Sequence, residues 1–130
     1  MPTISSVMQG LTRYMDEART AEVPEEVREK AKHHVLDTIA AMVSGSELKP
    51  GLFAIRYAER QGGLAEAQVV ASRLRVSAVN AAIANGMLAH ADETDDSNAA
   101  GGIHPGCAVV ATALAMAERE NASETSSCAR

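Results

Sequence analysis

The chain has 130 residues, of which 46% are hydrophobic and 22% charged, with a formal net charge of −5. This length suits one domain that buries most of its apolar surface, and the composition argues against wholesale disorder. The acidic balance argues against sequence-independent nucleic-acid binding, which needs clustered lysine and arginine. No apolar run approaches the ~20 residues of a spanning helix, so we also expect no membrane partner.

The first segment predicts an amphipathic helix, because its apolar residues keep three-and-four spacing from Ile4 to Ala18. A second helix is predicted from Pro24, with two glutamates at its positive end and Gly45 as a left-handed stop. The residues expected along its buried face are Val27, Ala31, Val35, Ile39 and Met42.

A shorter helix is predicted over residues 52–61, ended by the glycine pair 62–63. Residues 66–77 are the strand-like interval, where we expect a small hairpin. Ser77 is placed to cap the next helix, which is rich in small residues and therefore central. With only two tyrosines and one phenylalanine, the core must be mostly aliphatic, which favours close-packed helices.

Pro105 opens the last predicted helix, which is apolar nearly all round and so expected to be buried. Together these elements predict an all-α, bundle-like domain with at most one small hairpin. The helices around Ala81 and Val110 are too apolar for so small a domain to hide easily, so we expect further protein to cover them. Residues 122–130 lack periodicity and are expected to form an irregular tail.

The segment between the last two helices is the main candidate for chemistry. It crowds four carboxylates between two histidines: Asp92, Glu93, Asp95, Asp96, His90 and His104. Crowded, partly buried carboxylates shift one another's pKa, and histidine is the other common proton carrier, so the pattern suits general acid/base catalysis. The helix start at Pro105 would also favour an anion such as a substrate carboxylate.

Several other interpretations of this segment stay open. The acids could form a solvated turn or stabilise the start of the next helix, and His90 could be a core histidine. A zinc or manganese site is a further alternative, although the spacing does not fit an EF-hand loop. His33 and His34, inside the second helix, are expected to be solvated or structural.

The two cysteines, Cys107 and Cys128, form neither a CxxC pair nor a disulfide framework. The first ten residues also lack the pattern of a signal peptide. We therefore expect a cytoplasmic location, with Cys107 a small buried apolar residue rather than a nucleophile.

The order of the motifs resembles the MmgE/PrpD superfamily. The chain reads NGMLAHADETDDS, then HPG, then AVVATALAMAE. This is similar to the family's N-G-x-x-x-H segment, its D-x-D-D-[TS] run and its H-P-[GS] before an alanine-rich helix. The earlier stretch VPEEVREKAKHHVLDTIAAMVSG is similar to another family segment, and the resemblance runs from about Leu11 to Asn121.

The family includes 2-methylcitrate dehydratase, cis-aconitate decarboxylase and an iminodisuccinate epimerase. The resemblance therefore implies a lyase or isomerase that moves a proton next to a carboxylate of a small di- or tricarboxylate. It implies no metal and no organic cofactor, and a helical domain paired with a smaller α/β lid, usually in a homodimer. Residues 1–121 would then be the N-terminal part of that helical domain.

The resemblance also assigns site residues. The family's acids fall on Glu93, Asp95 and Asp96, its hydroxyl on Ser97 and its H-P-G histidine on His104. His104 is implied as the proton carrier or carboxylate contact, and the acids orient it, tune its pKa or bind substrate. Ser97 donates a hydrogen bond, while Asn85 and His90 hold the loop. The family commonly has aspartate and an aromatic where this chain has Glu93 and Thr94.

A polycarboxylate substrate needs cationic partners, and residues 90–104 contain no lysine or arginine. Family members are also several times longer. We therefore expect the chain to carry only part of an active site. The alternative is a truncated, non-catalytic helical module that dimerises through its apolar helices.

Overall fold

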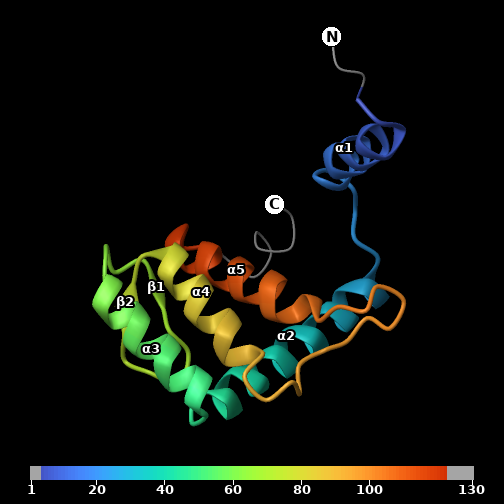
Figure 1. The fold of residues 1–130 in the computed structure, drawn as a ribbon. Coiled ribbons are helices and arrows are strands. Elements are labelled where there is room, and N and C mark those ends of the chain that lie inside the picture. Colours follow the sequence, from blue (N-terminus) through green and yellow to red (C-terminus); the bar gives the residue numbers. More distant parts are fainter. Residues whose placement is uncertain (1–3, 123–130) are drawn as a thin grey trace.

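Over residues 4–122, which the computed structural model describes, the chain forms five helices and one two-stranded hairpin (Figure 1). In chain order the elements are α1 (Ser6–Ala18), α2 (Glu25–Gly45), α3 (Lys49–Gln61), β1 (Ala67–Gln68), β2 (Arg75–Val76), α4 (Ala78–Ala89) and α5 (Pro105–Arg119). The strands are antiparallel, with Ala67 opposite Val76. The predicted all-α fold with one small hairpin is confirmed. The expected irregular tail, and with it Cys128, lies outside the described residues apart from Ala122.

Helix α4 is the centre of the fold, because α2, α3, α5 and both strands contact it. It begins where expected, with the Ser77 hydroxyl accepting a hydrogen bond from the backbone N–H of Asn80 at 3.4 Å. Its inward positions are mostly alanine, which lets the neighbouring backbones come close. The predicted central position of this helix is confirmed.

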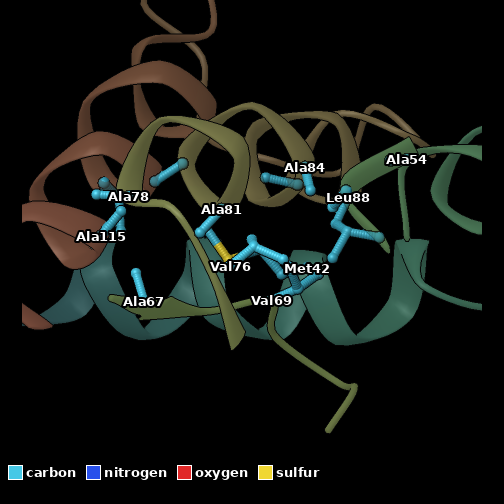
Figure 2. Close-up of a cluster of buried hydrophobic side chains, with 14 residues drawn as sticks. Met42, Ala54, Ala67, Val69, Val76, Ala78, Ala81, Ala84, Leu88 and Ala115 are labelled. Atoms are coloured by element: carbon cyan, nitrogen blue, oxygen red, sulfur yellow. The ribbon is translucent and has the colours of Figure 1, made fainter. Parts of the chain in front are cut away.

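The core beneath α4 is aliphatic, as predicted (Figure 2). Its largest fully buried apolar side chains are Met42, Val69, Val76 and Leu88, and most of its other members are alanines. All three aromatic side chains stay outside it: Tyr14 is 68%, Phe53 58% and Tyr57 43% exposed. The core is therefore packed by the close approach of helix backbones rather than by bulky side chains.

The expected buried face of α2 is wrong over its first half. Val27 and Val35 are 50% and 41% exposed, while the buried residues are Thr38, Ala41, Met42 and Gly45. The reason is that only the C-terminal half of α2 packs beneath α4, and its N-terminal half extends beyond the other helices (Figure 1). Periodicity finds an apolar face but does not show how far a neighbouring helix reaches along it.

Gly45 ends α2, but not through a left-handed conformation as predicted, since Gly62, Gly63 and Gly102 are the glycines with positive φ among the described residues. A Cβ on Gly45 would overlap the carbonyl oxygen of Leu88 and lie 2.9 Å from the Ala91 Cβ. Close contact with α4 therefore requires this glycine. The predicted glycine stop of α3 is confirmed at Gly62, where φ is 58°.

Helix α1 is amphipathic, as predicted, but none of its residues is buried, and it stands away from the other helices (Figure 1). The exposed apolar side chains of this segment are Ile4, Val7, Met8, Leu11, Tyr14 and Met15. Helix α5 is buried on one face rather than all round, because Val109 and Met116 are 64% and 38% exposed. Among the described helices, none has the length and apolar character needed to cross a bilayer.

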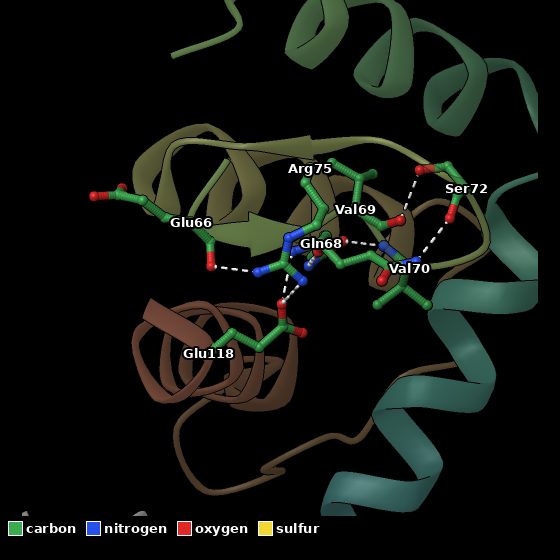
Figure 3. A network of polar contacts seen from close by, with 8 residues as sticks. Glu66, Gln68, Val69, Val70, Ser72, Arg75 and Glu118 are labelled. Carbon is green, nitrogen blue, oxygen red and sulfur yellow. Dashed lines mark hydrogen bonds and ion pairs between the residues drawn. The ribbon is translucent and has the colours of Figure 1, made fainter. Parts of the chain in front are cut away.

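Polar contacts tie the hairpin to the end of α5 (Figure 3). The Glu118 carboxylate accepts a hydrogen bond from the backbone N–H of Gln68 at 2.8 Å and pairs with the Arg75 guanidinium at 3.5 Å. Arg75 also donates to the carbonyl oxygen of Glu66 at 2.9 Å. These contacts fix the hairpin beside α5, and the loop with the clustered acids lies at the opposite end of that helix.

Candidate functional site

The two histidines of the acidic segment sit on the ends of two neighbouring helices. His90 is the C-cap of α4 and His104 is the N-cap of α5, and the two helices pack against each other. Between them the chain turns back on itself, where the backbone N–H of Asn98 donates to the carbonyl oxygen of Ile103 at 2.8 Å. The imidazole centroids are thereby held 5.2 Å apart, with their planes at 57°.

Asp95 lies between the two rings, and its side chain is completely buried. Its Oδ1 is 3.2 Å from His90 Nδ1, a hydrogen-bond distance, and 3.4 Å from His104 Nδ1, where the geometry is that of an ion pair. The histidine side chains are 47% and 35% exposed, so both reach solvent while a buried carboxylate fixes them from behind. A carboxylate that orients an accessible imidazole is a common general acid/base arrangement.

The Cys107 thiol joins this cluster from the first turn of α5. Its Sγ donates to the carbonyl oxygen of His104 at 3.1 Å. Burial, followed by the neighbouring Asp95 carboxylate, raises the pKa of the thiol. Cys107 packs partly against the core, as expected, but it also brings a sulfur within 4.8 Å of ligand atoms on His90 and Asp95. The sequence carries a signal for this placement, because Cys107 follows His104 by three residues at the start of a helix and so lies on the same side.

The Asp96 carboxylate contacts the start of α5. Its Oδ1 accepts a hydrogen bond from the backbone N–H of Gly106 at 2.6 Å, and its Oδ2 lies 3.8 Å from His34 Nδ1 on α2. The helix start that we expected to bind a substrate anion therefore already holds the protein's own carboxylate. A Cβ on Gly106 would overlap Asp96 Oδ1 and lie 2.7 Å from Thr38 Oγ1, so the glycine of HPG is needed for this contact.

Asp92 faces α2 rather than the cluster. Its carboxylate accepts hydrogen bonds from the hydroxyls of Ser44 and Thr94, both at 2.7 Å, and these bonds hold the pKa of Asp92 below its usual range. Glu93 and Ser97 are exposed, and with other described residues neither side chain forms a hydrogen bond or ion pair. Glu93 has a φ of 56°, in the left-handed region.

Asn85 is fully buried under the hairpin. Its side-chain amide donates to the carbonyl oxygen of Gln68 at 3.0 Å and accepts from the backbone N–H of Val70 at 2.9 Å. Of the residues expected at the site, the structure thus brings together His90, Asp95 and His104. It places Asp92 and Asp96 at the joints of the loop with α2 and α5, and Asn85 in the support of the hairpin.

Cationic partners for a substrate do not lie beside the loop carboxylates in the part of the chain that is described. Within residues 4–122, no lysine or arginine nitrogen comes within 4.0 Å of the carboxylate oxygens of Asp92, Glu93, Asp95 or Asp96. Among the described residues, the groups of the cluster that could carry a positive charge are therefore the histidines themselves.

Comparison with curated proteins and with solved structures finds no match for this chain. The family model described as the MmgE/PrpD N-terminal domain matches residues 9–128. That match contains every residue of the cluster and extends into the segment predicted as a tail. From this match to the family's N-terminal domain, the chain belongs to the MmgE/PrpD family.

Proposed function

We propose that this chain supplies the acid/base groups of a lyase or isomerase that moves a proton next to a carboxylate of a small di- or tricarboxylate. The observation that carries the proposal is the buried Asp95 carboxylate between two solvent-reaching imidazoles. Membership of the MmgE/PrpD family supports the chemical class. A reducing cytoplasm would suit the free thiol of Cys107.

In this mechanism Asp95, whose Oδ1 lies 3.4 Å from His104 Nδ1, orients the His104 ring, and Nε2 acts as the base. Nε2 takes the proton from the carbon next to the substrate carboxylate, and the electron pair of that bond passes into the carboxylate. Asp95 stabilises the imidazolium that forms. His90, whose ring centroid lies 5.2 Å from that of His104, would deliver a proton to a leaving hydroxyl, which gives dehydration, or to the carbanion, which gives inversion.

Binding of the substrate needs groups beyond this cluster. A dianion beside four acids is repelled, at roughly 4 kcal/mol for each pair 4 Å apart near a protein surface. We infer that the compensating lysine or arginine side chains do not come from residues 4–122 of the same subunit. A second subunit of a homodimer is one source of them. His90 and His104, when protonated, would supply the nearer part of that charge.

Deuterium exchange tests the proposal. The chain is incubated in D2O with cis-aconitate, 2-methylcitrate or iminodisuccinate, and incorporation at the carbon next to a carboxylate is followed by NMR. We expect exchange with at least one acid and a loss of about 10²-fold or more in His104→Ala. His33→Ala, an exposed histidine change on α2, is the matched control and should keep the wild-type rate. Equal rates in wild type and His104→Ala, or no exchange with any of the three, would contradict the proposed role.

A non-catalytic module that dimerises is the second candidate, and the exposed apolar face of α1 favours it. Val7 and Tyr14 on that face are 77% and 68% exposed. Sedimentation velocity would then show a dimer that Leu11→Glu dissociates and Gln9→Glu, on the polar face, leaves intact. A chain that stays monomeric at high micromolar concentration would contradict this alternative.

A further inference from the structure

Three side chains that could each bind a metal ion lie close together in the cluster. His90 Nδ1, a carboxylate oxygen of Asp95 and Cys107 Sγ all lie within 4.8 Å of one another. They come from three separate segments: the end of α4, the loop and the first turn of α5. Nitrogen, oxygen and sulfur ligands together are typical of zinc sites, whereas magnesium and calcium prefer oxygen alone.

Two buried atoms of the cluster lack partners among the described residues. They are Asp95 Oδ2 and His104 Nδ1, neither of which forms a hydrogen bond although His104 Nδ1 lies 3.4 Å from Asp95 Oδ1, and the Asp95 side chain has no exposed surface. A buried carboxylate oxygen without a hydrogen bond is costly, because it has lost its water and gained nothing in return. A bound cation would satisfy that oxygen.

We propose that His90, Asp95 and Cys107 bind a Zn²⁺ ion, and that the ion stops proton transfer at this site instead of assisting it. On binding, the Cys107 thiol loses its proton to solvent and the thiolate sulfur bonds to the ion. The ion takes the Nδ1 lone pair of His90, one of the two proton carriers, and the Asp95 carboxylate, which orients the other. The effect on turnover rests on the proposed function, whereas metal binding itself does not.

The distances are close to those of a tetrahedral zinc centre. Zn–N bonds of about 2.0–2.1 Å and Zn–S bonds of about 2.3 Å set neighbouring donor atoms roughly 3.3–3.7 Å apart. His90 Nδ1 is already 3.2 Å from Asp95 Oδ1, and the widest separation in the group is under 4.8 Å. Side-chain movements of about an ångström would bring the three donor atoms to the distances of a zinc centre. His104 Nδ1, at 3.4 Å from Asp95 Oδ1, is the candidate for the fourth position, with water as the alternative.

The test uses the chain with Cys128→Ser, so that Cys107 is the only thiol. After treatment with EDTA and its removal, the protein is titrated with ZnCl₂ by calorimetry and with CoCl₂ by absorption. We expect one ion per chain and a thiolate-to-cobalt charge-transfer band in the near ultraviolet. Cys107→Ser should abolish that band, and Cys107→Ser and Asp95→Asn should each weaken Zn²⁺ binding by at least about tenfold. His33→Ala is the matched histidine control and should bind like the parent.

Iodoacetamide gives a second readout, because bound Zn²⁺ should protect Cys107 from alkylation. Absence of stoichiometric binding, a cobalt spectrum without the thiolate band, or affinity unchanged in Cys107→Ser would each overturn the proposal. If Asp95→Asn does not fold, as judged by circular dichroism, the Cys107→Ser result decides alone, since that change replaces one atom. Zinc binding without deuterium exchange would overturn only the proposed function, and exchange without zinc binding would overturn only the metal site.

Discussion

Replacing Gly106 by alanine should break the joint between the acidic loop and α5. The new Cβ would overlap Asp96 Oδ1 and lie 2.7 Å from Thr38 Oγ1, so Asp96 must leave the Gly106 N–H. Loss of a hydrogen bond to a charged group costs about 1.5–3 kcal/mol, and the better helix propensity of alanine returns about 1 kcal/mol. The net loss is therefore about 0.5–2 kcal/mol of unfolding free energy.

For 130 residues, an unfolding entropy of about 2.1 cal/mol/K per residue converts this loss into a fall in Tm of about 2–7 °C. Differential scanning calorimetry measures it. Gly10→Ala is the matched control, because a Cβ there meets nothing within 4 Å, and we expect no loss of stability. Because alanine at position 106 already displaces Asp96, we also expect the stability losses of Asp96→Ala and Gly106→Ala to be less than additive in the double variant. Strictly additive effects, or a Gly106→Ala protein as stable as wild type, would refute this account of the glycine.

Three further changes probe the support of the site. Asn85→Ala should lower the unfolding free energy by about 1–3 kcal/mol, because it removes two part-buried hydrogen bonds that join the buried Asn85 side chain to the Val70 N–H and the Gln68 C=O, and urea unfolding measures the loss. Met42→Ala should cost about 2–5 kcal/mol by opening a cavity, whereas Val43→Ala, at a position 51% exposed, should change little in the same assay. Ser44→Ala removes a bond that lowers the pKa of Asp92, so its small destabilisation should be present at neutral pH and vanish as the carboxylate protonates below about pH 3.8. A Ser44→Ala effect that persists in thermal melts at pH 2 would contradict that sign.

Periodicity was enough to predict the helices and the hairpin, because each is a local property of the chain. It was not enough to place α2, whose apolar residues Val27 and Val35 remain exposed while Thr38 is buried. That outcome depends on where α4 crosses α2, which is a long-range contact. Gly45 shows the same limit, since its role comes from the Leu88 carbonyl across the crossing rather than from its own turn.

The sequence predicts where in the chain the candidate site lies but not how its side chains are arranged. The two histidines were singled out because helix ends bracket the acidic run, and the structure puts them there. Which acid points inward could not be predicted, because an irregular loop has no side-chain period. Only the fold shows that Asp95 is buried between the rings while Glu93 is exposed. The sequence does not predict the place of Cys107 in the cluster, because a cysteine at the start of an apolar helix is better explained as a small buried residue.

The acids of the loop do not act as one block of charge. Asp92 accepts hydrogen bonds from hydroxyls, Asp96 accepts one from the start of α5, and Glu93 faces solvent, so each lies in a different environment. This division matters because carboxylates that share one space repel a carboxylate substrate and one another. Asp95 is the loop carboxylate that lies between the two histidines, at 3.2 Å from His90 Nδ1 and 3.4 Å from His104 Nδ1. A carboxylate in this place orients both rings, and the proposed proton transfer depends on that arrangement.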